Sequence, residues 1–365
     1  MKIASVVGAR PQFIKCAPVL REFIKVGTSV LIHTGQHYDD NMSGVFFREL
    51  EIPPPEHDLG VGSGSHGAQT GEMLKRVEEV LSKERPDVVL VFGDTNSTLA
   101  GALAASKMHI PVAHVEAGLR SFNRKLPEEV NRVLTDHLSD VLFCPTQTAV
   151  NNLNREGIKK GVQLVGDVQR DIMNKVMETA KRTSTIIDRL CLNGTNYYLA
   201  TIHRPENTDD VGKLREIVNA FKILSRKHPV VWPIHPRTKS AIQQGRLLEV
   251  IPASLRLVDP VSYVDVVMLQ RHAKVVITDS GGIQKEACWL RVPCVTIRTE
   301  TEWVETVAAG WNVLVEAVTS RIIDRVFQAR RPESLMVEEV FGEGSPTLKI
   351  VEAILELGRR EERHR

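Results

Sequence analysis

The feature that most constrains the fold is a repeated pattern of short apolar segments, each followed by a polar turn and, in most cases, a segment with helical periodicity. Apolar runs lie at residues 3–7, 29–33, 87–92, 111–115, 141–144 and 162–165. After a polar zone of helix and loop at 179–195 they recur at 197–202, 230–234, 256–258, 275–278 and 293–297. Alternating strands and helices form parallel sheets covered by helices. The sequence therefore predicts two doubly wound α/β domains.

Length and composition agree with two domains. A chain of 365 residues with 42% hydrophobic and 25% charged residues exceeds the usual size of one domain. We predict a Rossmann-like domain over residues 1–169 and a second over residues 170–345, with a further helix within residues 346–365. Polar residues at the strand ends of both predict a binding cleft between the two halves.

Charge and cysteine content narrow the class of protein. Lys plus Arg number 47 and Asp plus Glu 45, a balance that does not suggest a nucleic-acid partner. Five cysteines without CxxC spacing indicate reduced thiols and no metal site. The apolar run before Gly8 is too short for a signal peptide or a membrane span, so we expect a cytoplasmic protein.

The segment 111–132 (PVAHVEAGLRSFNRKLPEEVNR) carries many charges directly after an apolar strand. Ligands of open α/β sheets bind beyond the carboxyl ends of the strands, where Glu116 is placed. Glu128, Glu129 and Arg132 follow in the same segment. Alternatively these are solvated loop charges, with Glu128 or Glu129 in the first turn of a helix after Pro127.

Asp94 stands at the carboxyl end of the strand predicted at residues 87–92. This position suits an acid or base of an active site. Alternatively, Asp94 or Thr95 caps the helix predicted at residues 97–108.

Two glycine-containing turns of the first half have different interpretations. GARPQFIK places Gly8, Arg10 and Lys15 where a strand ends and a helix begins, which favours an anion such as phosphate. GSGSHG at residues 62–67 matches GxGxxG, but we predict no strand at residues 53–60, so the match does not indicate a dinucleotide site.

In the second half, TDSGGIQKE places Ser280, Gly281 and Gly282 between a strand and a helix. Small residues there let backbone amides approach a diphosphate at the helix N-terminus, and Glu286 could accept two ribose hydroxyls. An ordinary turn explains SGG equally well. His203 and His235 end two successive strands and favour a function in proton transfer or charge stabilisation.

Seven motifs occur in order across nearly the whole chain: GARPQFIK, HTGQH, GDTNST, HVEAGLR, PEEVNR, HRPEN and TDSGGIQKE. With them the sequence resembles the non-hydrolysing UDP-N-acetylglucosamine 2-epimerase family. The resemblance implies a GT-B fold with the C-terminal helix packing on the first domain, a homodimer, and an isomerase that interconverts UDP-N-acetylglucosamine and UDP-N-acetylmannosamine without NAD or metal.

The resemblance also implies roles for individual residues. Asp94, Glu116, Glu128 and His203 match the acids and bases of the family, without an assignment of which carboxylate is the base. Arg10, Lys15 and Arg132 match groups near the phosphates or the acids, while Ser280, Gly281, Gly282 and Glu286 match the uridine diphosphate site. The implied route removes the C2 proton, expels UDP from C1 to leave a glycal, and adds UDP back after reprotonation on the other face.

Some positions depart from the common pattern. Many members have Thr-Glu-Arg-Pro-Glu where this chain has TEWVE, so Trp303 replaces an arginine. Together with GARPQ and SFN this resembles the branch acting on UDP-2,3-diacetamido-2,3-dideoxyglucuronate. Tyr38, Asp39 and Glu72 do not match the side chains that bind an activating UDP-N-acetylglucosamine in bacterial members, so that regulation is expected to be absent or altered.

A GT-B glycosyltransferase is the rival interpretation from another class, because it shares the fold and the diphosphate site. It needs no acid and base on opposite faces of C2, so the Asp94, Glu116 and Glu128 group favours an epimerase. A non-catalytic nucleotide-sugar sensor would have little use for these carboxylates, and a dehydrogenase lacks GxGxxG in context.

Overall fold

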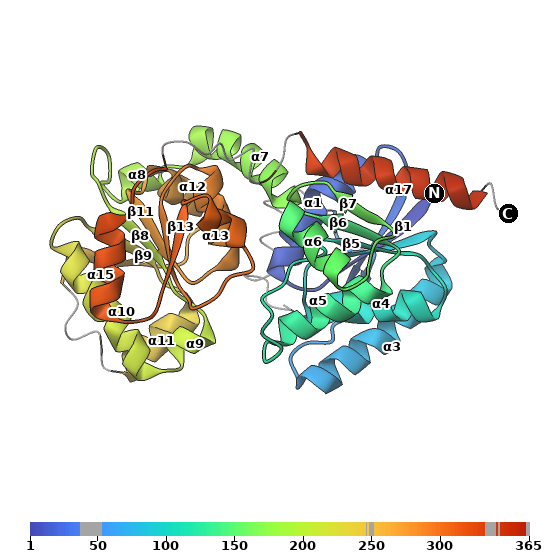
Figure 1. Ribbon diagram of the computed structural model, residues 1–365, viewed down its shortest axis with the longest axis horizontal. Coiled ribbons are helices and arrows are strands. Elements are labelled where there is room, and N and C mark those ends of the chain that lie inside the picture. The colour runs from blue at the N-terminus through green and yellow to red at the C-terminus, as the bar shows by residue number, and fades with distance from the viewer. Residues whose placement is uncertain (37–52, 246, 248–251, 333–340, 342–343, 363–365) are drawn as a thin grey trace. The chain divides into compact units, whose positions relative to one another are not determined.

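The computed structural model describes residues 1–36, 53–245, 247, 252–332, 341 and 344–362. It divides into two compact units, residues 1–172 with 341–365 and residues 173–340. Each unit is built on one parallel sheet (Figure 1). Helix α7 (Val168–Thr183) contains the boundary between the units. The sequence predicted a polar zone of helix and loop from residue 179, but the helix begins at Val168.

Unit 1 holds a seven-stranded sheet in the order β3-β2-β1-β4-β5-β6-β7. Its strands are β1 (Lys2–Val7), β2 (Thr28–His33), β3 (His57–Asp58), β4 (Val88–Phe92), β5 (Val112–Val115), β6 (Val141–Cys144) and β7 (Val162–Leu164). The prediction of no strand at residues 53–60 is wrong by the two residues of β3, which pair with the end of β2. Strands β4 and β5 consist of buried residues only, as expected for the middle of a parallel sheet.

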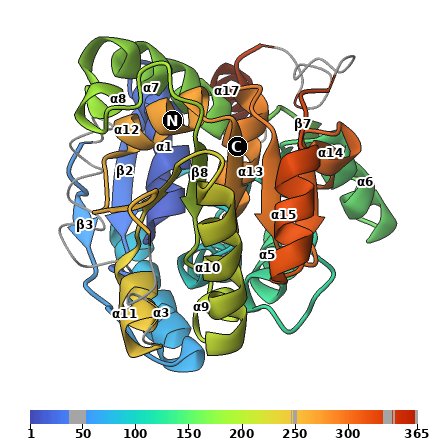
Figure 2. The same ribbon diagram turned by 90° about the vertical axis from the view of Figure 1, so that its left-hand side faces the viewer.

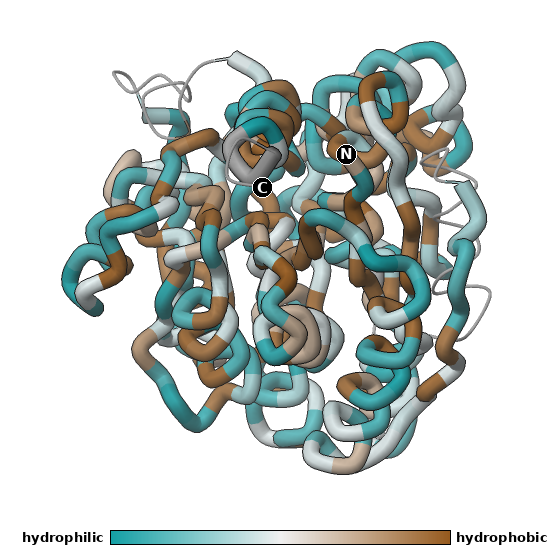
Figure 3. Tube along the Cα trace, turned by 90° about the vertical axis from the view of Figure 1, so that its right-hand side faces the viewer, coloured by the Kyte–Doolittle hydropathy of each residue, from teal (hydrophilic) through white to brown (hydrophobic). Residues whose placement is uncertain are grey.

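Helices cover both faces of this sheet. Helices α3 (His66–Glu84), α4 (Asn96–Lys107) and α5 (Pro127–Leu138) pack side by side, and α17 (Pro346–Glu362) lies against α1 (Arg10–Phe23) on the other side in Figure 1. Helix α6 (Gln147–Arg155) completes the unit. In Figure 3 the helices alternate between hydrophilic and hydrophobic residues, the pattern of helices that bury one face.

Unit 2 holds a six-stranded parallel sheet in the order β10-β9-β8-β11-β12-β13. Its strands are β8 (Tyr198–Thr201), β9 (Val230–Pro233), β10 (Leu255–Val258), β11 (Val275–Thr278), β12 (Cys294–Ile297) and β13 (Asn312–Val315). The sequence analysis did not single out β13. A hydrophobic core packs against this sheet. It includes Phe221 and Trp232, whose rings pack edge to face with their centroids 5.1 Å apart.

The helices of unit 2 follow the same alternation. They are α8 (Ile186–Arg189), α9 (Pro205–Thr208), α10 (Val211–Ser225), α11 (Pro236–Gln244), α12 (Tyr263–His272), α13 (Gly281–Trp289), α14 (Val304–Ala308) and α15 (Thr319–Gln328). Helices α10 and α15 lie side by side in Figure 2 and pack against each other. The strand order reverses between β1 and β4 in the first sheet and between β8 and β11 in the second. This is the arrangement of doubly wound folds, in which ligands bind at the carboxyl ends of the strands near the reversal.

Candidate active site

The first group of predicted site residues lies at the carboxyl ends of two neighbouring strands of unit 1. Phe92 of β4 and Val115 of β5 are in register, and the Gly93 N–H donates to the Val115 carbonyl at 3.0 Å. Asp94 and Glu116 follow these strands directly. The fold therefore brings the two carboxylates to one edge of the sheet, as the sequence predicts.

Glu116 forms an ion pair with Lys15 of α1. The Lys15 Nζ lies 2.5 Å from Glu116 Oε1, and each side chain is 9% exposed. A side chain at Gly93 would place its Cβ 3.3 Å from Lys15 Nζ, so the glycine leaves room for this pair. The pair is a charge-assisted contact largely shielded from water, which strengthens it.

The backbone at the start of α1 is less open to an anion than its sequence indicates. The Gln12 side chain accepts from the N–H groups of Gly8 and Ala9 at 2.8 and 3.0 Å. A phosphate would have to displace Gln12 to reach these two donors. Arg10 is the first residue of α1, and its side chain lies outside the described part of the structure.

Arg132 of α5 joins two carboxylates. Its guanidinium donates to Asp94 Oδ2 at 2.6 Å and to Glu129 Oε2 at 2.7 Å. Thr95, and not Asp94, caps α4 by accepting from the Thr98 N–H. The Asp94 side chain is therefore available for the ion pair with Arg132, and it is 27% exposed to solvent.

The two adjacent glutamates of the PEEVNR motif have different surroundings. Helix α5 begins at Pro127, so both lie in its first turn. Glu128 is exposed, whereas Glu129 is buried and accepts from the Ser121 and Phe122 N–H groups at 2.9 and 2.8 Å. Burial alone would raise the pKa of Glu129, but these donors and Arg132 outweigh it and hold the pKa below its usual value.

In unit 2, His203 lies beside a buried carboxylate. Strands β8 and β11 are in register at Thr201 and Thr278, so His203 and Asp279 end neighbouring strands. The Asp279 carboxylate accepts from the backbone N–H groups of His203 and Arg204 and from Asn207, and His203 Nδ1 lies 3.2 Å from it. Burial opposes ionisation of Asp279, yet the His203 contact and the other donors keep its pKa below the usual value.

His235 lies close to His203, with ring centroids 5.9 Å apart. It is the N-cap of α11, and its Nδ1 accepts from the Arg237 N–H at 3.2 Å. An accepting Nδ1 leaves Nε2 to carry the proton. The structure therefore brings together the two histidines that the sequence singled out.

The SGG turn opens helix α13, as the sequence predicts. Ser280 is the N-cap residue, but its side chain makes no capping hydrogen bond, and helix residues Gly281 and Gly282 follow. A helix start without a side-chain cap presents N–H groups and a partial positive charge to an anion. The Trp303 indole packs over this turn, since a Cβ on Gly281 would lie 3.6 Å from Trp303 Nε1.

Glu286 is 3% exposed and already held by protein groups. Tyr263 Oη donates to Glu286 Oε1 at 2.9 Å, and Gln270 Nε2 donates to Oε2 at 2.6 Å. Both partners lie on α12, and the sequence analysis did not identify them. The two contacts orient the Glu286 carboxylate.

Trp303 contacts a buried lysine. Lys285 of α13 is 1% exposed, and its Nζ lies 3.8 Å from the centre of the Trp303 ring and 5.5 Å from that of Trp289. An ammonium over an indole face is a favourable cation–π arrangement, stronger when it is desolvated. The Lys285 ammonium therefore lies directly against the Trp303 ring.

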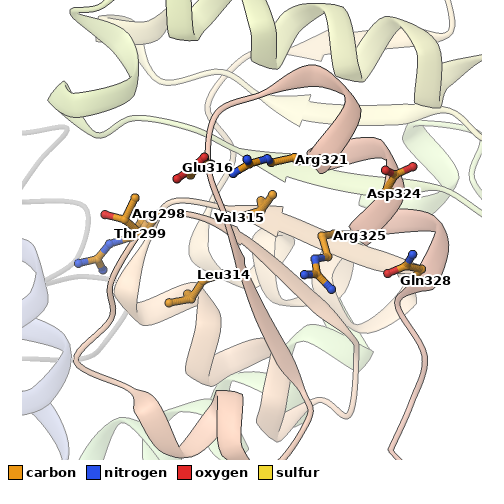
Figure 4. Close-up of a pocket in the computed structure, with 9 residues that line it drawn as sticks. All are labelled: Arg298, Thr299, Leu314, Val315, Glu316, Arg321, Asp324, Arg325 and Gln328. Carbon is orange, nitrogen blue, oxygen red and sulfur yellow. Dashed lines mark hydrogen bonds and ion pairs between the residues drawn. The ribbon is translucent and has the colours of Figure 1, made fainter.

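Unit 2 also has a hollow of about 540 Å³ near β13 and α15 (Figure 4). Arg298, Glu316, Arg321 and Arg325 are among its lining residues, and none of the predicted site residues lines it. Arg298 pairs with Glu302 at 2.9 Å, and Arg321 pairs with Glu316.

Other expectations concern regulation, metals and membranes. Glu72 pairs with Arg76 at 2.6 Å, while Tyr38 and Asp39 lie outside the described residues. Within the described ranges, no group of three or more His, Cys, Asp or Glu side chains is placed to hold a metal ion. In the same part of the chain no helix has both the length and the apolar character needed to cross a membrane.

Comparison with known proteins identifies the family. The sequence model described as UDP-N-acetylglucosamine 2-epimerase matches residues 25–355. A UDP-N-acetylglucosamine 2-epimerase homolog of Methanococcus maripaludis is 52% identical over 98% of this chain and 100% of its own length. The UDP-2,3-diacetamido-2,3-dideoxy-D-glucuronate 2-epimerase of Pseudomonas aeruginosa is 46% identical, with the same shares covered.

A solved structure gives the same result. The Methanocaldococcus jannaschii UDP-GlcNAc 2-epimerase, crystallised with UDP-GlcNAc and UDP, superposes with a TM-score of 0.87 at 42% identity, covering 98% of this chain and 100% of that one. The two doubly wound units are those of the GT-B fold, as the sequence predicts. This chain belongs to the UDP-N-acetylglucosamine 2-epimerase family and is an enzyme of the epimerase class.

Proposed function

We propose that this enzyme inverts C2 of UDP-N-acetylglucosamine to give UDP-N-acetylmannosamine, without hydrolysing the sugar nucleotide. The observation that carries the proposal is the pair of carboxylates, Asp94 and Glu116, at the ends of neighbouring strands, each held by a cation. Three relatives, 43%, 45% and 52% identical, are named UDP-N-acetylglucosamine 2-epimerases or a homolog of one, which supports this substrate.

The reaction requires two half-reactions that share an intermediate. A base removes the C2 proton while the C1–O bond breaks, so that the C–H electron pair forms the C1–C2 double bond of the glycal and UDP departs with the bonding pair. An acid then protonates C2 from the other face, and a UDP oxygen re-forms the bond to C1. The chemistry therefore needs a base, an acid and positive charge near the departing diphosphate.

We assign the acid and base functions to Asp94, Glu116, Glu128 and His203. Their different surroundings support a division of roles: Glu116 is paired with Lys15, Asp94 with Arg132, and His203 with Asp279, while Glu128 is exposed. A carboxylate paired with a cation is held in its ionised form, which suits a base. A ligand phosphate that draws the cation away would favour the protonated form, which suits an acid.

The diphosphate and the nucleoside have their own candidate groups. Arg10, Lys15, Arg132 and His235 would supply positive charge or hydrogen-bond donors to the phosphates. The uncapped start of α13, formed by Ser280, Gly281 and Gly282, would bind the diphosphate through backbone N–H groups. Glu286, oriented by Tyr263 and Gln270, would accept the ribose hydroxyls.

The proposal is tested by proton NMR of the purified enzyme in D2O with UDP-N-acetylglucosamine. The expected result is loss of the C2 proton signal, with deuterium incorporated at C2, and growth of the manno isomer. If the C2 proton persisted, the epimerisation of this substrate would be refuted. Free UDP that accumulated in proportion to lost substrate would instead indicate hydrolysis.

Two observations favour UDP-2,3-diacetamido-2,3-dideoxyglucuronate as an alternative substrate of this enzyme. The Pseudomonas aeruginosa relative named for the diacetamido-glucuronate sugar is 46% identical. Trp303, part of the sequence pattern that resembles this branch, contacts the buried Lys285. The same NMR experiment with UDP-2,3-diacetamido-2,3-dideoxyglucuronate distinguishes the two. Faster C2 exchange with the uronate would assign this chain to that reaction.

We further propose a cytoplasmic homodimer. All five cysteines are free, in keeping with a reducing compartment, and UDP-sugars are the substrates named for the relatives. Val130 and Leu134, one turn apart on α5, are 41% and 46% exposed and offer an apolar surface to a second copy. Light scattering at the mass of two chains is expected, and a mass of one chain would refute the dimer.

A further inference from the structure

His114, in the middle of β5, is fully buried and makes two hydrogen bonds through its ring. Its Nδ1 lies 2.7 Å from Asp136 Oδ1 and its Nε2 lies 2.8 Å from the Gly93 carbonyl oxygen. The side chains of His114 and Asp136 are both 0% exposed. The two ring nitrogens therefore face oxygen atoms of the protein, out of reach of bulk solvent.

The two oxygen atoms can only accept. A carbonyl oxygen carries no proton, and Asp136 accepts from the Gly118 N–H at 3.1 Å and from Arg120 Nη1 at 2.7 Å, contacts that favour the ionised carboxylate. A neutral imidazole would direct a lone pair at one of these acceptors. Both ring nitrogens of His114 are therefore placed to donate, which requires a proton on each.

The charges around the ring balance when it is protonated. Arg120 donates to both oxygens of Glu156, each at 2.7 Å, as well as to Asp136. His114 and Arg120 then contribute two positive charges, and Asp136 and Glu156 two negative charges. A buried ion pair is tolerated when its geometry is good and further hydrogen bonds satisfy its polar atoms. Asp136 fits this description, because His114, Arg120 and the Gly118 N–H all lie within hydrogen-bond distance of its carboxylate.

This charged group lies beneath the turns that carry two proposed catalytic carboxylates. Gly93, whose carbonyl accepts from His114, directly precedes Asp94 and has a φ of +65°. Gly118, whose N–H donates to Asp136, follows Glu116 by two residues and has a φ of +80°. One network thus holds the backbone beside each carboxylate.

We propose that His114 carries a proton on both ring nitrogens and is a positioning residue, which fixes the Gly93 turn and thereby the placement of Asp94 relative to Glu116. It touches no substrate and transfers no proton. The positioning role rests on the proposed functions of Asp94 and Glu116, whereas the charge on the ring rests on the geometry alone.

The charge is tested by neutron diffraction from a deuterated crystal of the unaltered chain at about pH 8, where a free histidine is neutral. Deuterium is expected on both Nδ1 and Nε2 of His114. Deuterium on only one nitrogen would overturn the proposal, whatever the sugar substrate proves to be and whether or not any variant folds.

The positioning role is tested with two substitutions that each keep one donor. The amide nitrogen of asparagine can occupy the place of Nδ1, and that of glutamine the place of Nε2. His114→Asn thus keeps the bond to Asp136 and loses the bond to Gly93, while His114→Gln does the reverse. We expect turnover to fall about a hundredfold in His114→Asn and about tenfold in His114→Gln, since misplaced reacting groups lose rate.

Stability separates this role from a merely structural one. His114→Gln leaves buried Asp136 short of a donor, so its melting temperature is expected to be the lower of the two. Turnover and stability then rank the variants in opposite orders, and turnover that followed stability would overturn the positioning role. UDP affinity, measured by calorimetry, is expected to stay within about twofold of the unaltered enzyme.

A matched control is His57→Gln, because His57 pairs with Glu84 at 2.7 Å on edge strand β3. Turnover of this control is expected to change less than about twofold. If neither sugar exchanged its C2 proton even in the unaltered enzyme, the proposed function would fail, while the neutron result would still decide the charge on His114.

Discussion

Glu128 and Glu129 are adjacent in the sequence, yet we expect their substitution to affect different properties. Removing the charge of Glu128 should lower turnover, whereas removing that of Glu129 should lower stability. The substitution Glu→Gln keeps the size of the side chain, removes its charge and replaces one acceptor oxygen by an NH2 donor. Glu128 is exposed and is a proposed catalytic group. Glu129 is 2% exposed as a residue and supports the loop at Ser121 and Phe122.

The magnitude for Glu129→Gln follows from its contacts. Its carboxylate accepts two backbone N–H groups, the Ser121 hydroxyl at 3.1 Å and Arg132 at 2.7 Å. A glutamine would turn an amide NH2 toward some of these donors and remove the charge that pairs with buried Arg132. Breaking a buried ion pair in this way costs about 3–5 kcal/mol of unfolding free energy. Glu128→Gln is expected to change it by less than about 0.5 kcal/mol.

The assay is urea unfolding of the two variants and the unaltered chain, with turnover measured in parallel. Glu128→Gln should lower turnover at least about a hundredfold with an unchanged unfolding midpoint. Glu129→Gln should shift the midpoint to lower urea. Equal midpoints for the two variants would refute the inference that Glu129 is a buried anchor.

The pH dependence provides a second check on Glu129. Its pKa is lowered in the folded chain by the backbone N–H donors and Arg132 against the effect of burial. The stabilising contribution is therefore fully present above the unfolded value of about 4.3 and is lost as the pH falls through the folded value. The stability difference between the unaltered chain and Glu129→Gln should thus be complete at pH 7 and shrink in acid. A difference that grew on acidification would contradict the assigned sign.

Three further predictions concern the proposed site. Asp94→Asn or Glu116→Gln should reduce C2 exchange at least about a hundredfold and leave the UDP dissociation constant nearly unchanged, and near-normal exchange would remove either residue from the chemistry. Glu286→Ala should weaken UDP binding by about tenfold or more in calorimetry, since two hydroxyl contacts would be lost; an unchanged constant would exclude it from the ribose site. Trp303→Arg places a second cation beside Lys285 and should alter the ratio of rates for the two UDP-sugars, whereas an unaltered ratio would show that position 303 does not select the sugar.

The sequence predicts the fold well because its signals are local. Buried strands such as β4 and β11 are continuous apolar runs, and their carboxyl ends are marked by polar residues. Two elements were not predicted correctly. Strand β3 has two residues, too few to show an alternating pattern. Helix α7 begins at Val168, and its many polar residues make its apolar positions hard to recognise in the sequence. Edge strand β13 (NVLV) is a short apolar run like the other strands, and the sequence interpretation overlooked it.

The site was harder to predict because its contacts join residues far apart in the sequence. Lys15 meets Glu116 across 101 positions, and His203 meets Asp279 across 76. The motifs identified the members of these pairs but not the pairing. Tyr263 and Gln270, which orient Glu286, carry no local signal, because a tyrosine and a glutamine on an ordinary helix look like core and surface residues.

Glu116 shows why the geometry of such a site needs the whole fold. Its φ is +75°, a left-handed conformation that costs a side-chain-bearing residue about 1–2 kcal/mol and that a sequence favours only with glycine or asparagine. The surroundings compel it: the Glu116 and Ala117 N–H groups both donate to the Phe143 carbonyl, and Lys15 holds the carboxylate. The strained backbone aims this side chain past the end of β5, toward Lys15 and the Gly93 turn. Relaxing it would therefore separate Glu116 from its partner Lys15, which is why the strain is found at the proposed catalytic residue.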